Sequence, residues 1–191
     1  MNKAVFLDRD GVINREVDVL RSLKQLRLLP RVAQAVRQLN KLGFLIIVVT
    51  NQPVIARGWL TEKEIDAIHN VLIKRLSSKG ARIDEIYYCP HHPNANLKKY
   101  RRRCQCRKPN IGLIKKAVKK FKINVKESFM VGDGTGDILA GKRAGLKTIL
   151  VETGYAGKDG KYDVKPDFII KNLNEAIKII KNKCLKKLPK P

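Results

Sequence analysis

Short apolar runs alternate with segments of helical periodicity along the chain. The runs are rich in β-branched and aromatic residues and predict strands over 4–7, 44–49, 83–88, 129–131, 148–151 and 168–170. They are continuously apolar, whereas a half-exposed strand alternates between apolar and polar positions. Each predicted strand is therefore expected to be buried on both faces of its sheet.

Between these runs, apolar side chains recur at helical spacing over 32–42 and 65–76. Thr61 and Glu64 have the spacing of a capping box at the start of the second helix. Three more helices are predicted, beginning after Asn110, after the loop at Asp133 and after Asn172. The alternation predicts an α/β fold, a doubly wound, Rossmann-like three-layer sandwich with a mostly parallel sheet.

The chain has 191 residues, 43% of them hydrophobic, which suits one domain over 1–191 with a sizeable core. Its lysine- and proline-rich end, 184–191, is expected to fray. No stretch approaches the roughly 18 apolar residues of a membrane span, and a charged residue comes too early for a signal peptide. We therefore expect a cytoplasmic protein without a membrane partner. Nothing in the pattern indicates a dimer seam, so a monomer is expected.

The formal charge is +24, from 41 Lys+Arg against 17 Asp+Glu. Such a charge attracts any polyanion, including nucleic acid and phosphorylated metabolites. Because the lysines are spread along the whole chain, a solvated surface is the favoured interpretation. Nucleic acid is expected only as a nonspecific electrostatic partner.

Two carboxylates close the first predicted strand. Asp8 and Asp10 are two positions apart, so both lie on the same side of extended chain and Arg9 points elsewhere. Two like charges this close need a divalent cation or a shared proton, and Gly11 permits the turn that follows. An isolated Asp-x-Asp-Gly turn is, however, common.

Three more polar sets follow other predicted strands or precede a helix: Thr50-Asn51-Gln52, Arg107-Lys108, and Asp133 with Asp137. Taken singly, Thr50 could cap a strand, Asp137 could cap a helix, and the basic pair could be surface charge. In a parallel sheet, however, the carboxyl ends of the strands meet at one edge, where ligands bind. Together the four sets predict one site.

A Cys89-x-His91 pair and a Cys104-x-Cys106 pair are separated by twelve residues. Three thiolates and one imidazole are the ligands of a closed, tetrahedral structural zinc site. His92 could replace His91 as the fourth ligand. The zinc would hold a long irregular loop immediately before Arg107 and Lys108.

These four polar sets, in this order, resemble the motifs of the haloacid dehalogenase superfamily of phosphotransferases. The resemblance implies that Asp8 is a nucleophile forming an aspartyl phosphate and that Asp10 is the general acid and base. It implies Mg²⁺ held by Asp8, the Asp10 main-chain carbonyl and Asp133, with Asp137 in support. The stretches between the motifs leave no room for a large cap domain.

The resemblance also implies the groups that bind substrate. Thr50 and the neighbouring main chain of Asn51 and Gln52 would bind phosphate oxygens, Lys108 would neutralise charge, and Arg107 would clamp the substrate.

Within the superfamily, Tyr-Tyr-Cys-Pro-His-His-Pro and Cys-Gln-Cys-Arg-Lys-Pro are similar to the heptose bisphosphate phosphatases, which remove the 7-phosphate and whose pattern favours His91 as the zinc ligand. The related histidinol-phosphate phosphatases share much of this pattern. A nucleic-acid-end phosphatase and a non-catalytic, basic nucleic-acid-binding protein remain as alternatives, although the intact Asp8, Asp10, Lys108 and Asp133 argue against the latter.

Overall fold

The computed structural model describes residues 1–185 and contains a six-stranded sheet in the order β3-β2-β1-β4-β5-β6. All neighbouring strands are parallel. The strands are β1 (Lys3–Leu7), β2 (Phe44–Asn51), β3 (Glu85–Cys89), β4 (Phe129–Gly132), β5 (Lys147–Val151) and β6 (Phe168–Ile170). The six predicted strands and the doubly wound topology are therefore confirmed.

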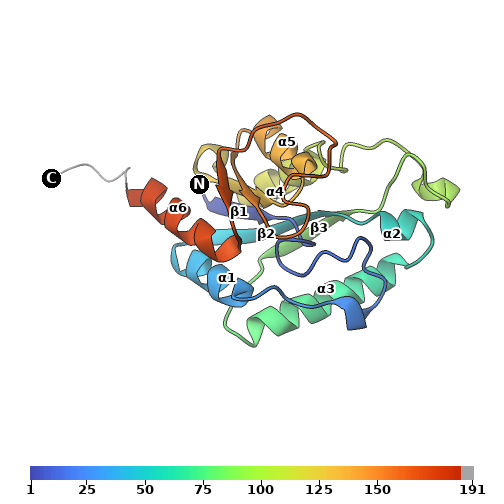
Figure 1. The fold of residues 1–191 in the computed structure, drawn as a ribbon, viewed down its shortest axis with the longest axis horizontal. Coiled ribbons are helices and arrows are strands. Elements are labelled where there is room, and N and C mark those ends of the chain that lie inside the picture. Colours follow the sequence, from blue (N-terminus) through green and yellow to red (C-terminus); the bar gives the residue numbers. More distant parts are fainter. Residues whose placement is uncertain (186–191) are drawn as a thin grey trace.

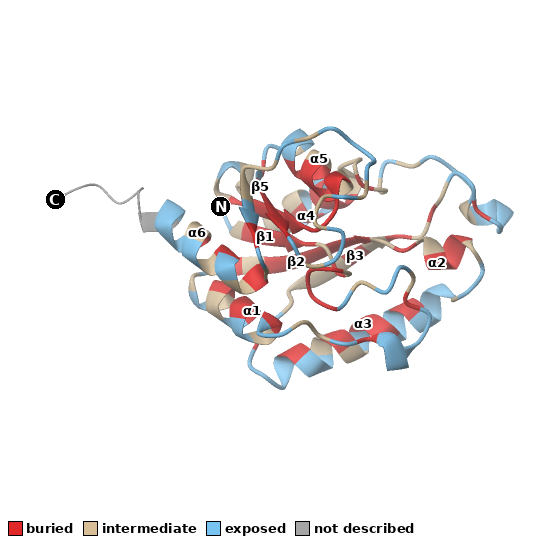
Figure 2. Ribbon diagram, in the orientation of Figure 1, coloured by how far each residue is buried: buried red, intermediate tan, exposed pale blue. Residues whose placement is uncertain are grey.

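Helices cover both faces of this sheet (Figure 1). One face packs against α1 (Val32–Lys41), α3 (Glu62–Ser77) and α6 (Leu173–Leu185), and the other against α4 (Gly112–Phe121) and α5 (Thr135–Arg143). Alternate residues of β1 serve the two layers, since Val5 and Leu7 join the first core cluster and Ala4 and Phe6 the second. Figure 2 shows the central strands buried between the helical layers.

Helix α3 begins at the predicted capping box. The Thr61 hydroxyl accepts a hydrogen bond from the Glu64 N–H at 3.2 Å, and the Glu64 carboxylate accepts from the Thr61 N–H at 2.7 Å. Ile65 and Leu72 are fully buried on the inner face of the helix, and His69 on the same face is 5% exposed. This face lies against the sheet near the end of β1.

The connections differ from the prediction only in short elements. The helix α2 (Pro53–Ala56), directly after β2, was not predicted, nor were the 3-10 turns at Leu23–Gln25, Lys98–Tyr100 and Val125–Glu127. Within residues 1–185 no domain is inserted between the motifs, and no helix there is long and apolar enough to cross a bilayer. Helix α6 continues through Leu185, and the rest of the tail expected to fray, 186–191, lies outside the described residues.

Candidate active site

The carboxyl ends of β1, β2 and β4 surround a cavity of about 220 Å³. Eight of the predicted site residues line it: Asp8, Asp10, Thr50, Asn51, Arg107, Lys108, Asp133 and Asp137. Gln52 is not among the lining residues, because its side chain lies behind Asp10 and is 3% exposed. The sheet thus brings together residues that are up to 129 positions apart in the chain.

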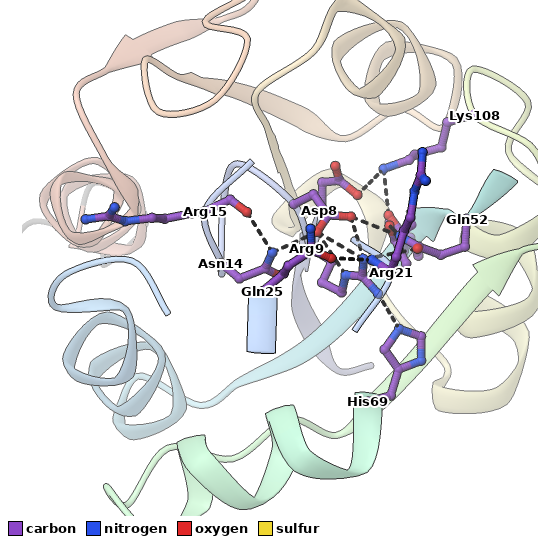
Figure 3. Close-up of polar contacts among 12 residues, drawn as sticks. Asp8, Arg9, Asn14, Arg15, Arg21, Gln25, Gln52, His69 and Lys108 are labelled. Carbon is purple, nitrogen blue, oxygen red and sulfur yellow. Dashed lines mark hydrogen bonds and ion pairs between the residues drawn. The ribbon is translucent and has the colours of Figure 1, made fainter. Parts of the chain in front are cut away.

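Lys108 is the buried cation of the cavity (Figure 3). Its ammonium contacts the Asp8 carboxylate at 2.7 Å, the Asp137 carboxylate at 2.6 Å and the Val49 carbonyl at 2.7 Å. Burial alone would lower the pKa of Lys108, but Asp137 and Asp8 outweigh it and raise the pKa. Two hydrogen bonds between the Asn51 amide and the Lys108 main chain, 3.1 and 3.0 Å long, fix its position.

Three carboxylates converge beside this lysine, with oxygen atoms of Asp8, Asp133 and Asp137 within 4.8 Å of one another. Burial raises the pKa of the Asp8 carboxyl to about 6, against the opposing effect of Lys108. Burial, with the charges of Asp8 and Asp137, raises the pKa of Asp133 to about 9. One lysine does not neutralise three carboxylates, so the cluster has the oxygen donors and the charge that suit Mg²⁺.

The Asp133 carboxylate packs against the backbone at two glycines. A Cβ atom at Gly11 would lie 2.2 Å from the Asp133 Oδ2 atom, and a Cβ at Gly154 would lie 2.1 Å from it. The same oxygen accepts a hydrogen bond of 2.8 Å from the Tyr155 N–H, and the Asp133 carbonyl accepts one of 2.7 Å from the Gly157 N–H. The loop after β5 therefore holds this carboxylate in place.

Asp10 lies apart from the carboxylate cluster and binds Arg9 instead. Arg9 does not line the cavity, as expected from its position between the two carboxylates, but its guanidinium folds back to contact both Asp10 oxygens at 2.7–3.2 Å. Asn14 and Gln52 also donate to the Asp10 carboxylate, at 2.7 and 3.0 Å. Although burial acts to raise the pKa of Asp10, Arg9 and these amides hold it below its usual value.

The last residues of β2 and Gln52, which follows the strand, have mostly internal partners. The Gln52 side-chain amide donates to the Thr50 hydroxyl oxygen at 2.9 Å, and the Gln52 main-chain N–H donates to the Cys89 carbonyl at 2.8 Å. The main-chain N–H and the side-chain amide of Gln52 are thus both engaged within the protein, contrary to the expectation that its main chain binds phosphate. Thr50 and Asn51 remain at the cavity wall.

Cys89, His91, Cys104 and Cys106 form the second cluster of metal-ligating groups. The three sulfur atoms are 3.0–3.3 Å apart, and the His91 Nδ1 atom lies 3.4 Å from Cys106 and 3.8 Å from Cys89. His92 accepts a hydrogen bond from the Asn94 N–H and lies outside the cluster, so His91 is the histidine of the set. The cluster joins the end of β3 to the loop before α4.

The cluster also contacts the cavity wall. Arg107 follows Cys106 in the chain, and its guanidinium donates a hydrogen bond of 3.2 Å to the His91 carbonyl. Burial lowers the pKa of Arg107 from its ordinary value. The geometry of the cysteine–histidine cluster thus decides where Arg107 enters the cavity.

Several cavity residues were missed from the sequence. Glu16 lines the cavity, and burial followed by the charges of Asp10 and Asp8 raises its pKa to about 7. Tyr155 and Tyr162, from the loop after β5, also line it. Nothing in the local pattern separates Glu16 from other surface acids. The one local signal near Tyr155 was Gly154, three positions after β5, since glycine is typical of positions where the backbone approaches another group closely.

Comparisons with known proteins identify the family of this chain. The HAD-hydrolase-like family model matches residues 105–176. A D-glycero-beta-D-manno-heptose-1,7-bisphosphate 7-phosphatase of Pasteurella multocida is 38% identical over 183 residues, covering 95% of this chain and 98% of the relative. One from Rhodopseudomonas palustris is 41% identical over 143 residues, covering 75% of this chain and 79% of the relative. The chain therefore belongs to the family of heptose 1,7-bisphosphate 7-phosphatases.

A solved structure extends the comparison to the metal. The D,D-heptose 1,7-bisphosphate phosphatase of B. bronchiseptica, crystallised with magnesium and phosphate, superimposes with a TM-score of 0.83 at 28% identity, covering 95% of this chain and 99% of that one. The family member described here is therefore a phosphatase of the haloacid dehalogenase superfamily, with the α/β fold and the carboxylate cluster of a magnesium-dependent enzyme.

Proposed function

We propose that this enzyme removes the 7-phosphate of D-glycero-D-manno-heptose 1,7-bisphosphate through an aspartyl phosphate on Asp8. The observation that carries the proposal is the Asp8 carboxylate, bound by Lys108 at 2.7 Å and lining one cavity with Asp10. Similarity to heptose bisphosphate phosphatases along 95% of the chain supports this substrate.

In the first step, Asp8 attacks phosphorus. Its Oδ1 atom accepts the hydrogen bond from Lys108, which leaves Oδ2 as the attacking oxygen. As the Oδ2–P bond forms, the bond from phosphorus to the sugar oxygen breaks, and Asp10 gives that oxygen its proton. The charge of an arriving phosphate raises the pKa of Asp10 and so favours the protonated form.

In the second step, water hydrolyses the aspartyl phosphate. Asp10, now ionised, accepts a proton from the water as the water oxygen attacks phosphorus. The bond between phosphorus and Asp8 breaks, and inorganic phosphate and the free carboxylate remain. Arg9, Asn14 and Gln52 hold the Asp10 carboxylate in the same place for both steps.

Asp8, Asp133 and the main-chain carbonyl of Asp10 would hold Mg²⁺, with Asp137 close to the same position. When bound, the cation supplies positive charge that offsets the repulsion between an anionic nucleophile and an anionic ester. The absence of a Cβ atom at Gly11 and Gly154 fits this assignment, because it allows Asp133 to lie against the backbone beside the nucleophile.

We assign phosphate binding to Thr50, Asn51 and Lys108. The Thr50 oxygen accepts from Gln52, so its own hydrogen is available for a phosphate oxygen. The hydrogen bond from the Gln52 side-chain amide orients this hydroxyl. Arg107, which also lines the cavity, would clamp the second phosphate or the sugar oxygens through two donors.

We assign Zn²⁺ to Cys89, His91, Cys104 and Cys106. Three sulfurs and one imidazole nitrogen within 4.8 Å of one another support a closed structural site. The free, reduced state of the three thiols that this needs agrees with a cytoplasmic enzyme. We further propose that the chain acts as a single-domain monomer and that nucleic acid binds it only through nonspecific charge.

The test is phosphate release with magnesium from heptose 1,7-bisphosphate, histidinol phosphate and a 3′-phosphorylated oligonucleotide, beside an Asp8→Asn control. We expect turnover of the heptose ester, lost in the control, with ³¹P NMR showing that the 1-phosphate remains. Faster turnover of either other ester would reject the substrate assignment. Turnover that persists in Asp8→Asn would reject the nucleophile.

A further inference from the structure

Arg9 is a fully buried cation inside the protein, with 0% of its surface exposed. A buried guanidinium is costly unless its donors are satisfied by acceptors of fixed position. Asp10 satisfies Nε and part of Nη2, and the Gln52 side-chain oxygen accepts from Nη2 at 3.0 Å. The remaining arm of the fork, Nη1, points away from the cavity toward helix α3.

That arm meets His69. The Arg9 Nη1 atom lies 3.1 Å from the His69 Nε2 atom, in the interior of the protein (Figure 3). Arginine has only donors, so Nε2 is the acceptor and the imidazole is neutral, with its proton on Nδ1. Burial, followed by the Arg9 charge, lowers the pKa of His69 to about 3, which agrees with a permanently neutral ring.

His69 is itself well fixed. It projects from α3, whose first turn is capped by Thr61 and whose inner face is buried at Ile65 and Leu72. Its ring lies against Tyr88 of β3, with 5.5 Å between the ring centroids. A rigid helix on one face of the sheet therefore connects, through two side chains, to the carboxylate that faces the reacting phosphate.

We propose that His69 is a positioning residue for catalysis, which fixes the guanidinium of Arg9 and through it the carboxylate of Asp10. The inference rests on the role of Asp10 given under the proposed function. Without the His69 acceptor, the guanidinium rotates to find another partner and the Asp10 carboxylate moves with it. Protonation of the leaving oxygen then becomes slow.

A purely structural role for His69 predicts something different. Loss of a buried acceptor would then lower stability and reduce turnover of every ester by the same factor. A positioning role reduces only the step that needs a proton from Asp10. Because a phenolate leaves without protonation whereas a sugar alkoxide does not, the leaving group separates the two roles.

The experiment measures kcat/KM, which reports formation of the aspartyl phosphate, for a series of aryl phosphates of decreasing leaving-group acidity and for heptose bisphosphate. His69→Leu removes the acceptor, and His69→Gln keeps an amide oxygen near the position of Nε2. Leu72→Ala is the matched control, since it opens a cavity on the same face of α3 without touching Arg9.

For His69→Leu we expect kcat/KM on the heptose ester to fall at least about tenfold, with the most acidic aryl ester unchanged and the dependence on leaving group steeper than in the natural protein. His69→Gln should restore the shallow dependence. Leu72→Ala should lower the melting temperature and leave the ratio of the two esters unchanged. An equal loss on all esters in His69→Leu would overturn the inference.

Two further measurements keep the result decisive. If His69→Leu does not fold, His69→Phe keeps an aromatic ring against Tyr88 but offers Arg9 no acceptor, and the same steepening is expected. A wild-type protein that already shows a steep dependence on leaving group would reject Asp10 as the acid, whatever the His69 variants show. A shallow wild-type dependence that stays shallow in both variants would reject the inference alone.

Discussion

Gly154 is the position where one methyl group tests the geometry of the cation site most directly. The residue has a φ of +72°, and an added Cβ would lie 2.1 Å from the Asp133 Oδ2 atom and 2.8 Å from the Gly11 Cα atom. A Cβ atom essentially never lies within 3.0 Å of another non-bonded heavy atom, so the carboxylate would have to move by about 1 Å. Gly154→Ala would therefore displace Asp133 from the position beside Asp8.

Gly160 provides the matched control. It lies in the same loop with a φ of +62°, but a Cβ added there meets nothing within 4 Å. Both alanine variants share the cost of a left-handed backbone, roughly 1–2 kcal/mol of unfolding free energy. Only Gly154→Ala also disturbs the site, and a misplacement of about 1 Å lowers turnover by about 100-fold.

The assay has two parts. Urea unfolding should show Gly160→Ala less stable than the natural protein and Gly154→Ala less stable still. Phosphate release, titrated with magnesium, should show nearly normal kcat for Gly160→Ala and, for Gly154→Ala, a large loss with a higher magnesium requirement. Equal kcat and equal magnesium requirement in the two variants would refute the assignment of Asp133 as a ligand held by this loop.

Four further outcomes are expected. Lys108→Met should lower kcat by about 10²- to 10³-fold in steady-state phosphate release, because it removes a preorganised buried charge. The pKa of Asp133, about 9, lies above its ordinary value, so this group stabilises the metal-free protein at low pH. The contribution is lost as the pH rises through that pKa. Thermal melts should therefore show a magnesium-induced increase in Tm that grows with pH. A zinc chelator, followed by excess magnesium, should lower Tm and kcat together, because Arg107 adjoins the cysteine cluster. Thr61→Ala should cost about 1 kcal/mol in urea unfolding and leave kcat unchanged.

The first three of these outcomes each have a contrary result that the same measurement would reveal. A normal kcat in Lys108→Met would show that the charge of Lys108 does not stabilise the reaction. A magnesium effect on Tm that is independent of pH would mean that protons and the cation do not compete at Asp133. Full activity after loss of zinc would show that the cysteine–histidine cluster does not position Arg107 for catalysis.

The sequence predicted the layers of the fold because burial leaves a direct record in it. Strands such as β2 are apolar at nearly every position, and the capping box of α3 is local, so neither depends on distant residues. The meeting of Asp8 and Lys108 followed from parallel topology, which brings strand ends to one edge. Helix α2 was missed because it has only four residues and one turn leaves little periodicity to detect.

The partners of the Arg9 guanidinium could not be predicted in the same way. Side chains alternate between the two faces of a sheet only as far as the strand extends. Beyond that point the direction of a side chain depends on which distant acceptors are available. Here the acceptors are Gln52 and His69, 43 and 60 positions away. His69 did carry a weak signal, because it shares a helical face with Ile65 and Leu72, but the face alone does not name its partner.

The ion pair of Arg9 and Asp10 also ties the chemistry of the enzyme to its folding. Active-site carboxylates commonly strain a protein, and replacing them tends to stabilise it. Asp10 is only partly buried, but its removal would leave the fully buried Arg9 charge without a counter-charge, and breaking a buried pair in this way costs up to about 3–5 kcal/mol. Variants selected only for thermal resistance should therefore retain Asp10, so that a stability screen protects the acid–base group of this enzyme without any selection for activity.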